Sequence, residues 1–173
     1  MRSLAVLALT LSLAMTSVAE DDLVTRNQLK LNLAGAELAL QAAKDKAAEM
    51  KLKVNIAVVD DGGHLLAFAR LDGARPASLY TAITKATSSA TLRAATGPLP
   101  PGIERPDPLL NLSVQNAAAL SGGKFTTLLG GVPVIVEGQV IGALGVGGAS
   151  GEQDAEIAKA GVAALVGAIK PEK

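Results

Sequence analysis

Two glycine-rich apolar segments constrain the fold of this chain more than any other feature. They span residues 54–74 and 130–148, and in each one a short polar turn separates two apolar stretches. Asp61-Gly62 divides the first segment and Glu137-Gly138 divides the second, and such dipeptides suit the positive φ angles of tight turns. The pattern predicts two antiparallel β-hairpins.

A two-residue loop in the first hairpin would place Val59 opposite His64. Side chains alternate between the faces of a strand, so this register predicts which residues share a face. Both faces are largely apolar, which predicts that helices cover the hairpin on both sides. The members of one predicted face are Asn55, Ala57, Val59, His64, Leu66, Phe68 and Arg70.

Helical patterns surround the hairpins. We expect helices over residues 33–50 with Asn32 or a neighbour as the cap, 77–95 after Pro76, and from a Ser150/Gln153 capping box to about residue 169. Residues 109–120 are expected to form a short helical or irregular segment. The helix over 77–95 is expected to bury Leu79, Ile83, Ala86, Ala90 and Ala94, and to expose Thr81, Thr84, Thr87, Ser88 and Thr91.

The remaining segments include two further predicted strands, over residues 28–33 and 124–129. Five prolines exclude regular structure from the loop 96–108, and a loop of this length is typical of a lid, a binding loop or a disordered connector. The whole pattern predicts one α/β domain with a central antiparallel sheet and helices packed on its faces.

Residues 1–19 have the features of a secretory signal peptide: a positive start at Arg2, an apolar stretch, and small residues before a cleavage point after Ala19. The alternative, a membrane span, needs roughly 20 apolar residues, and this stretch is shorter. We therefore expect a periplasmic or secreted domain over residues 20–173 that does not insert into a membrane.

Composition excludes several classes of function. The 16 basic and 16 acidic side chains balance and form no basic block, which argues against a nucleic-acid partner. The absence of cysteine excludes disulfides, a thiolate nucleophile and covalently attached haem. With aromatic residues only 2% of the chain and Ala and Gly abundant, little area is buried per residue, so we expect a homo-oligomer.

Several motifs resemble those of the GlcG/HbpS family of small haem-binding proteins. Val58–Ala74 matches V-V-D-x-G-G-H-L-x-A-F-x-R-x-D-G-A, and Ala82–Ala90 matches A-x-x-K-A-x-x-x-A. Gly130–Pro133 matches G-G-x-P, Gly138–Gly148 matches G-x-x-x-G-A-x-G-V-x-G, and Glu152–Asp154 supplies E-Q-D. The resemblance covers roughly residues 30–168.

This resemblance implies a profilin-like α-β-α fold and assembly into dimers or higher oligomers. Several exported members bind haem without a covalent bond, sometimes with slow haem degradation, whereas others accompany glycolate or diol metabolism. The chain departs from the family in the loop 96–108. Relatives commonly carry a Gly-Pro-Leu-Tyr-type turn nearby, and this loop holds no aromatic residue.

The candidate iron ligands are one histidine and two oxygen donors. His64 is the only histidine, and imidazole is the commonest protein ligand of haem iron, with Phe68 on the same predicted face to pack on a porphyrin. The alternative for His64 is a hydrogen bond to a backbone carbonyl. Tyr80 and Thr96 offer oxygen, of which the resemblance favours Thr96. Packing or helix capping is the alternative for both.

Arg70, Arg75 and Lys85 are candidates to hold the haem propionates through charge-assisted hydrogen bonds. Arg70 has an alternative in an ordinary ion pair with Asp72. The glycines at 142, 145, 147 and 148 allow two interpretations: a nucleotide-binding loop, or close contact between a helix and a strand, which we favour because the dinucleotide motif is incomplete.

The resulting functional prediction is an exported, oligomeric haem-binding protein, with slow haem degradation or redox sensing as a further activity. It favours a binding protein over a dedicated enzyme. The rival hypothesis is a haem-free binding or scaffold module for a small organic acid or a partner protein, because aromatic residues for clamping a porphyrin are scarce. A third hypothesis is a cofactor-free enzyme that uses Asp60 and His64.

Overall fold

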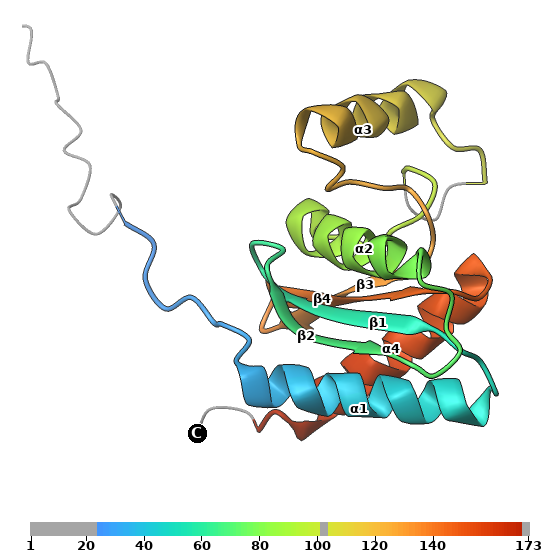
Figure 1. Cartoon of the computed structure of the whole chain (residues 1–173). Coiled ribbons are helices and arrows are strands. Elements are labelled where there is room, and N and C mark those ends of the chain that lie inside the picture. Colours follow the sequence, from blue (N-terminus) through green and yellow to red (C-terminus); the bar gives the residue numbers. More distant parts are fainter. Residues whose placement is uncertain (1–23, 101–103, 171–173) are drawn as a thin grey trace, which may run out of the picture.

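The computed structural model describes residues 24–100 and 104–170 (Figure 1). The predicted signal peptide, residues 1–19, lies outside the described residues. The elements in chain order are α1 (Leu33–Glu49), β1 (Asn55–Asp60), β2 (Leu65–Arg70), α2 (Ser78–Leu92), α3 (Pro108–Leu120), β3 (Gly131–Val136), β4 (Gln139–Gly147) and α4 (Gly151–Ala168). This is the predicted α/β domain.

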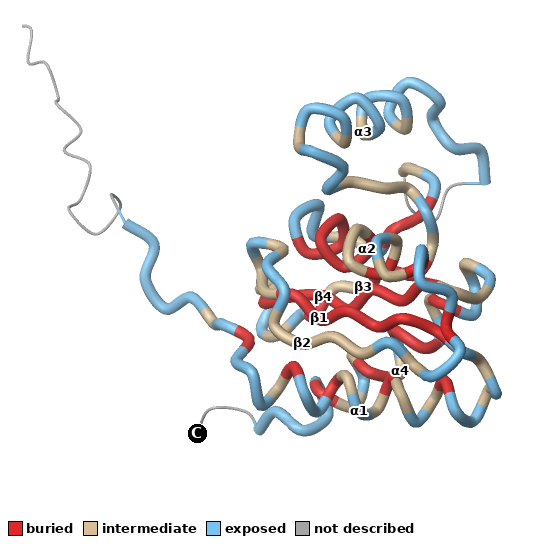
Figure 2. The backbone as a smooth tube through the Cα atoms, in the orientation of Figure 1, coloured by how far each residue is buried: buried red, intermediate tan, exposed pale blue. Residues whose placement is uncertain are grey.

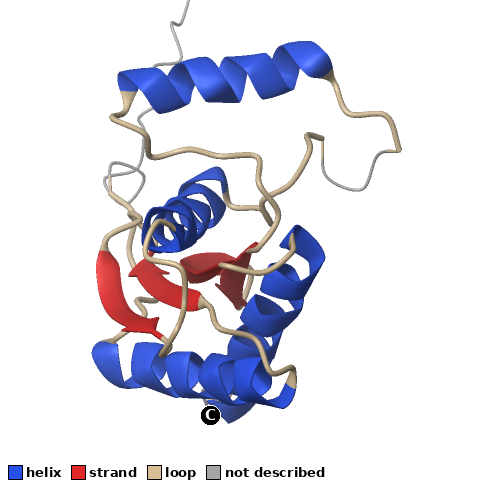
Figure 3. Ribbon diagram, turned by 45° about the vertical axis from the view of Figure 1, so that its right-hand side comes forward, coloured by secondary structure: helices blue, strands red, loops and turns tan. Residues whose placement is uncertain are grey.

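The two predicted hairpins build one antiparallel sheet with strand order β2-β1-β4-β3. Each hairpin contributes one inner strand, and β1 pairs with β4 from Asn55 opposite Gly147 to Asp60 opposite Gly142. The inner strands are buried on both faces (Figure 2). Helices α1 and α4 cover one face and α2 covers the other, which gives the α-β-α layers (Figure 3).

The core is built from aliphatic and small side chains. The larger cluster lies between the sheet and α1 and α4, and the second lies between the sheet and α2, where Ala82, Ala86 and Ala90 face Ala57 and Val59. Gly145 makes this second contact close, because a Cβ there would collide with the backbone of Ala82 and Ala86. Gly145 and Gly147 thus serve helix–strand packing, the favoured of the two interpretations, whereas Gly142 lies against the backbone of β1.

The first hairpin turn corrects the predicted register. The loop is three residues long, with Gly63 at φ +81°, and Val59 pairs with Leu65 rather than with His64. The Asp60 side chain explains the extra residue, since its Oδ1 accepts the backbone N–H groups of Gly62 and His64 at 2.9 and 2.8 Å. A three-residue loop with a glycine in this conformation is a common hairpin connection.

The second hairpin turn agrees with the prediction. Glu137 and Gly138 have φ values of 50° and 76°, the positive pair that a two-residue type I′ turn requires. The helix caps also agree: Asn32 caps α1 through Gly35, and Ser150 and Gln153 form the complete capping box of α4.

Neither of the two additional predicted strands forms. Residues 28–32 are extended but unpaired, because α1 begins at Leu33 and the Leu29 N–H donates instead to the Gln139 side chain. Residues 124–129 run along α2 rather than beside a strand. There the Ser88 hydroxyl donates to the Lys124 carbonyl and accepts from the Thr126 N–H, so one helix side chain takes the place of a strand partner.

The predicted faces of α2 are wrong in part, and this segment explains one of the differences. Thr87 and Ser88 are buried, whereas Leu79 and Ile83 are only half-buried. The burial of Ser88 follows from its contacts with residues 124–126 on that side of the helix. The helix also ends earlier than predicted, at Leu92, because Arg93 takes the left-handed conformation with φ 56°.

Of the two predicted alternatives for residues 109–120, the structure shows the helix, α3, which stands away from the sandwich on the far side of α2 (Figure 1). Asp107 caps it by accepting the N–H groups of Leu109 and Leu110. None of its residues is buried, and Leu109 and Leu120 are 77% and 92% exposed. Across the described residues, every helix is too short or too polar to cross a bilayer.

Candidate functional site

The predicted site residues do not form one cluster, and several lie at the surface. The His64 side chain is 81% exposed, with its Nδ1 3.3 Å from Asp60 Oδ1 at the hairpin turn. Tyr80 is 73% exposed and Arg70 is also exposed, while Phe68 is half-buried against the second core cluster. The ion pairs among the described residues do not include one between Arg70 and Asp72.

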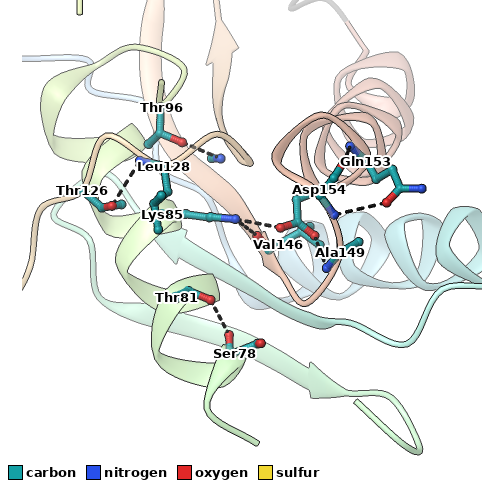
Figure 4. Close-up of polar contacts among 12 residues, drawn as sticks. Ser78, Thr81, Lys85, Thr96, Thr126, Leu128, Val146, Ala149, Gln153 and Asp154 are labelled. Carbon is teal, nitrogen blue, oxygen red and sulfur yellow. Dashed lines mark hydrogen bonds and ion pairs between the residues drawn. The ribbon is translucent and has the colours of Figure 1, made fainter. Parts of the chain in front are cut away.

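Arg75 and Lys85 do come together, in a small depression that we call the polar recess. It has a volume of about 190 Å³ and lies where α2, residues 128–129 and the start of α4 meet. Most of its polar groups are shown in Figure 4. The lining residues are Arg75, Thr81, Lys85, Leu128, Leu129, Gly148, Ala149, Gly151 and Asp154.

A buried ion pair forms one wall of the polar recess. Lys85 Nζ lies 2.7 Å from Asp154 Oδ2 and donates to the Val146 carbonyl at 2.9 Å (Figure 4). The other oxygen of Asp154 accepts the Ala149 N–H at 3.1 Å. The two side chains are only 5% and 2% exposed, and hydrogen bonds of this kind are what make the burial of two charges tolerable.

The local backbone is shaped around this ion pair. Gly130 has φ +123°, and a Cβ there would come within 3.0 Å of Lys85 Nζ and 2.7 Å of Asp154 Cβ. Glycine is therefore required for both its backbone conformation and the space it leaves. The first residues of β3 and α4 are held against α2 in a fixed geometry.

Thr96 lies at a second place, which we call the apolar cavity. This cavity has a volume of about 280 Å³ and lies between the C-terminal end of α2 and helix α3. Its surface is almost entirely apolar, and its lining residues are Leu92, Ala94, Ala95, Thr96, Gly97, Leu99, Leu110, Val114 and Thr126.

The Thr96 hydroxyl is held in place by the edge of the sheet. Thr96 is 5% exposed, and its Oγ1 accepts the Gly131 N–H at 2.8 Å. The Thr96 N–H in turn donates to the Gly131 carbonyl at 3.0 Å. The apolar cavity is therefore lined by one threonine whose hydroxyl is held by the sheet, and Thr126 is the other polar residue of its lining.

The segment 126–129 runs between the two places. Thr126 lines the apolar cavity, while Leu128 and Leu129 line the polar recess. The structure thus separates Thr96 from Arg75 and Lys85, which the sequence interpretation had assigned to one site. His64, Phe68, Tyr80 and Arg70 line neither place.

Sequence reasoning missed Asp154 and the leucines of the apolar cavity. One signal for Asp154 was available: Lys85 lies among Ala82, Ala86 and Ala90 on a helix, and a cation on an apolar face needs a buried anion. Leu110 and Val114 gave no comparable signal, because their role depends on where α3 is placed. The described residues contain no group of three acidic or histidine side chains that would hold a metal ion.

Comparison with known proteins gives concordant matches. The model of the family described as haem degrading protein HbpS-like matches residues 31–163. Protein GlcG of Escherichia coli K12 is 40% identical over 111 residues, which cover 64% of this chain and 76% of GlcG.

Two solved structures resemble the whole domain. An HbpS variant of Streptomyces reticuli superposes with a TM-score of 0.67 and 31% identity, over 89% of this chain and 99% of HbpS. A structure described as a PduOC–heme complex superposes with a TM-score of 0.65 and 25% identity, over 79% of this chain and 95% of that chain.

Proposed function

Because the chain belongs to the HbpS-like family, we propose that it binds haem without a covalent bond, in the apolar cavity beside Thr96. One relative with the same fold is described in complex with heme. The main support for the proposal is an apolar cavity that is lined by Thr96, whose hydroxyl is held by the sheet, and is bounded on one side by a helix with no buried residue.

The apolar lining of the cavity suits a flat apolar ring, but the cavity must widen to hold one. Its volume of about 280 Å³ is just below the roughly 300–1,000 Å³ typical of small-molecule pockets. Leu110 and Val114 contribute the α3 wall, and no residue of α3 is buried. An outward shift of α3 therefore sacrifices little buried area, and we expect the helix to move when the ring enters.

Thr96 is the residue we assign to the iron. Its Oγ1 already accepts the Gly131 N–H, and a hydroxyl oxygen has a second lone pair to offer. Leu92, Leu99 and Leu110 line the same cavity and offer apolar contacts to a bound ring. When bound, haem would supply the redox chemistry of its iron, including any slow degradation, and the protein would supply orientation and access.

A haemin titration tests this proposal. Adding haemin to the purified protein and recording the Soret band should give a saturable shift that ends at a stoichiometric amount. Thr96→Ser should keep the spectrum, because the hydroxyl stays, whereas Thr96→Val should change it. His64→Ala, at an exposed position, should leave it unchanged. The absence of a saturable shift in the unmodified protein would refute haem binding.

We also propose that copies of the protein associate through α3. Leu109, Leu112 and Leu120 are 77%, 54% and 92% exposed, which is an unusual concentration of apolar surface on one helix. Light scattering after size exclusion should show an oligomer. Replacing Leu109 and Leu120 by Gln should dissociate it, and a monomeric unmodified protein would contradict the proposal.

Export is the third part of the proposed function. It is supported by the sequence of residues 1–19. Expression of the whole chain in a bacterium, followed by mass measurement on the periplasmic fraction, should give a protein that begins at Glu20. Recovery of the intact chain from the cytoplasm would contradict export.

A further inference from the structure

We propose that the polar recess binds the carboxylate group of a small monocarboxylate anion, at a site separate from the apolar cavity. The recess is a built feature of the domain, because it is lined by a buried ion pair, an arginine and two backbone segments that contain glycine. The inference does not depend on haem binding.

Lys85 provides the first donor. Its ammonium group has three N–H bonds, and the structure uses two of them, toward Asp154 and toward the Val146 carbonyl. The third N–H has no partner within the described residues, although the residue is only 4% exposed and lines the recess. An unused donor on a buried cation is costly, and an acceptor from a ligand would satisfy it.

Arg75 provides a second and wider donor. Its Nε donates to the Ser78 hydroxyl at 2.9 Å, and its carbonyl accepts the Asn55 side-chain amide at 3.1 Å. These two bonds hold the Arg75 carbonyl and Nε, and they leave the two terminal amino groups for a ligand. A guanidinium group binds a carboxylate through two parallel hydrogen bonds, which makes it the better match for a planar anion.

The lining residues of the recess carry a net charge of one positive unit, which one negative charge would neutralise. Arg75 and Lys85 are cations, and Asp154 is the only carboxylate among the lining residues. Both oxygens of Asp154 are already engaged, by Lys85 and by the Ala149 N–H. One positive charge is left over, so a monoanion restores neutrality and a dianion exceeds it.

The size of the recess limits the rest of the ligand. Its volume of about 190 Å³ is well below the roughly 300–1,000 Å³ of pockets for larger molecules. Leu128 and Leu129 add apolar side chains to the lining, which suits a short alkyl group. Acetate and propionate have these properties, whereas a porphyrin ring is too large for the recess itself.

A titration of the isotope-labelled, haem-free protein with sodium acetate tests the site. The amide chemical shifts of Gly148 and Gly151 should change until the site is saturated. A final acetate concentration on the order of 50 mM is enough to define a millimolar dissociation constant. Sodium chloride at the same ionic strength is the blank. Arg75→Gln, which is exposed and should fold, is expected to weaken binding about tenfold.

Arg105→Gln is the matched control, because it removes an exposed arginine that does not line the recess and should leave the dissociation constant unchanged. The absence of a saturable shift with acetate, or equal affinity for acetate in the Arg75→Gln variant, would overturn the proposal. Equal binding of inorganic phosphate at pH 8 would also overturn it, since a monoanion is expected to bind more tightly.

The same carboxylate chemistry also occurs in the propionates of haem, and a second titration distinguishes the two sources. If the acetate-induced shifts persist after the protein is saturated with haemin, a free acid occupies the recess, as proposed. If haemin abolishes them, the recess holds a haem propionate, and the free-acid assignment is overturned. Failure of haemin to bind would refute the proposed function and leave the acetate result intact.

Discussion

The polar recess and the apolar cavity are both lined by residues of the segment 126–129, yet they are constructed in opposite ways. The recess is fixed by a buried ion pair and by Gly130, where even one added carbon would collide. The cavity has the Thr96 hydroxyl held by the sheet on one side, and on another side it is bounded by α3, a helix that buries nothing.

This difference indicates two kinds of binding site. A recess that is already organised loses little conformational entropy when a ligand arrives, and suits a small, rigid anion. A cavity with a loosely attached wall can open for a larger ring, at the cost of ordering α3 in the complex. Variants that remove the fixing interactions of each site in turn test this difference.

The largest effect is expected from Lys85→Met. The substitution leaves Asp154 buried without its cation, and breaking a buried ion pair in this way costs about 3–5 kcal/mol of unfolding free energy. Chemical denaturation measures it. Adding Asp154→Asn, which still accepts the Ala149 N–H but carries no charge, should recover part of the loss.

The exposed pair of Lys30 and Asp61 is the control for this measurement. Its atoms are also 2.7 Å apart, but the side chains are 58% and 37% exposed. Lys30→Met should therefore cost less than about 1 kcal/mol. Equal costs for the two lysine variants would mean that the recess is not organised by its ion pair.

Thr96→Val is expected to have the next largest effect. It keeps the shape of the side chain and removes the acceptor of the buried Gly131 N–H, which costs about 1–3 kcal/mol. Thr96→Ser should recover most of this stability. If Thr96→Val leaves the stability unchanged, the hydrogen bond from the Gly131 N–H does not hold the Thr96 hydroxyl in place.

Removing the N-terminal caps of α4 and α3 is expected to have a smaller effect on stability, and the effect should differ between the two helices. Ser150→Ala removes the cap of α4, which is packed on the sheet, and should cost about 1 kcal/mol of global stability. Asp107→Ala removes the cap of α3 and should leave global stability unchanged, while the amides of that helix exchange faster with solvent. A global loss in Asp107→Ala would show that α3 is part of the cooperative fold.

The same division explains how far the sequence predicts the structure. The hairpins, the caps at Asn32 and Ser150, and the layers follow from local patterns, because turn and cap chemistry involves residues close in the chain. The strand predicted over residues 124–129 is wrong because its partner is Ser88, a hydroxyl 36 residues away from Lys124. A pattern that counts apolar residues does not contain such a contact.

The candidate site was predictable only in pieces for the same reason. Thr96, Arg75 and Lys85 were identified by residue type and by family resemblance, and the structure places each beside a recess or cavity. Their division between two places depends on the path of residues 126–129 and on Asp154, 69 residues from Lys85. His64 was singled out because it is unique, and its turn leaves it exposed.

The smallest effect concerns Glu152, in the first turn of α4 beside the recess. Its pKa is lowered below 4.5, first by its own backbone N–H and then by the Ser150 hydroxyl, which both favour the charged carboxylate. A lowered pKa in the folded state means that the group stabilises the fold above pH 4.5, and that this contribution is lost as pH falls through the folded-state pKa.

Carbon NMR of the Glu152 carboxyl across pH 2–6 measures this titration directly. The midpoint should lie below the ordinary value, and Ser150→Ala should bring it partly back, since one of the two donors is then gone. Helix α3 has no acidic residue in its first turn. If Glu152 titrates at its ordinary value, the first turn of α4 is frayed, and Gly151 would not provide the fixed edge that the recess needs to recognise a small anion.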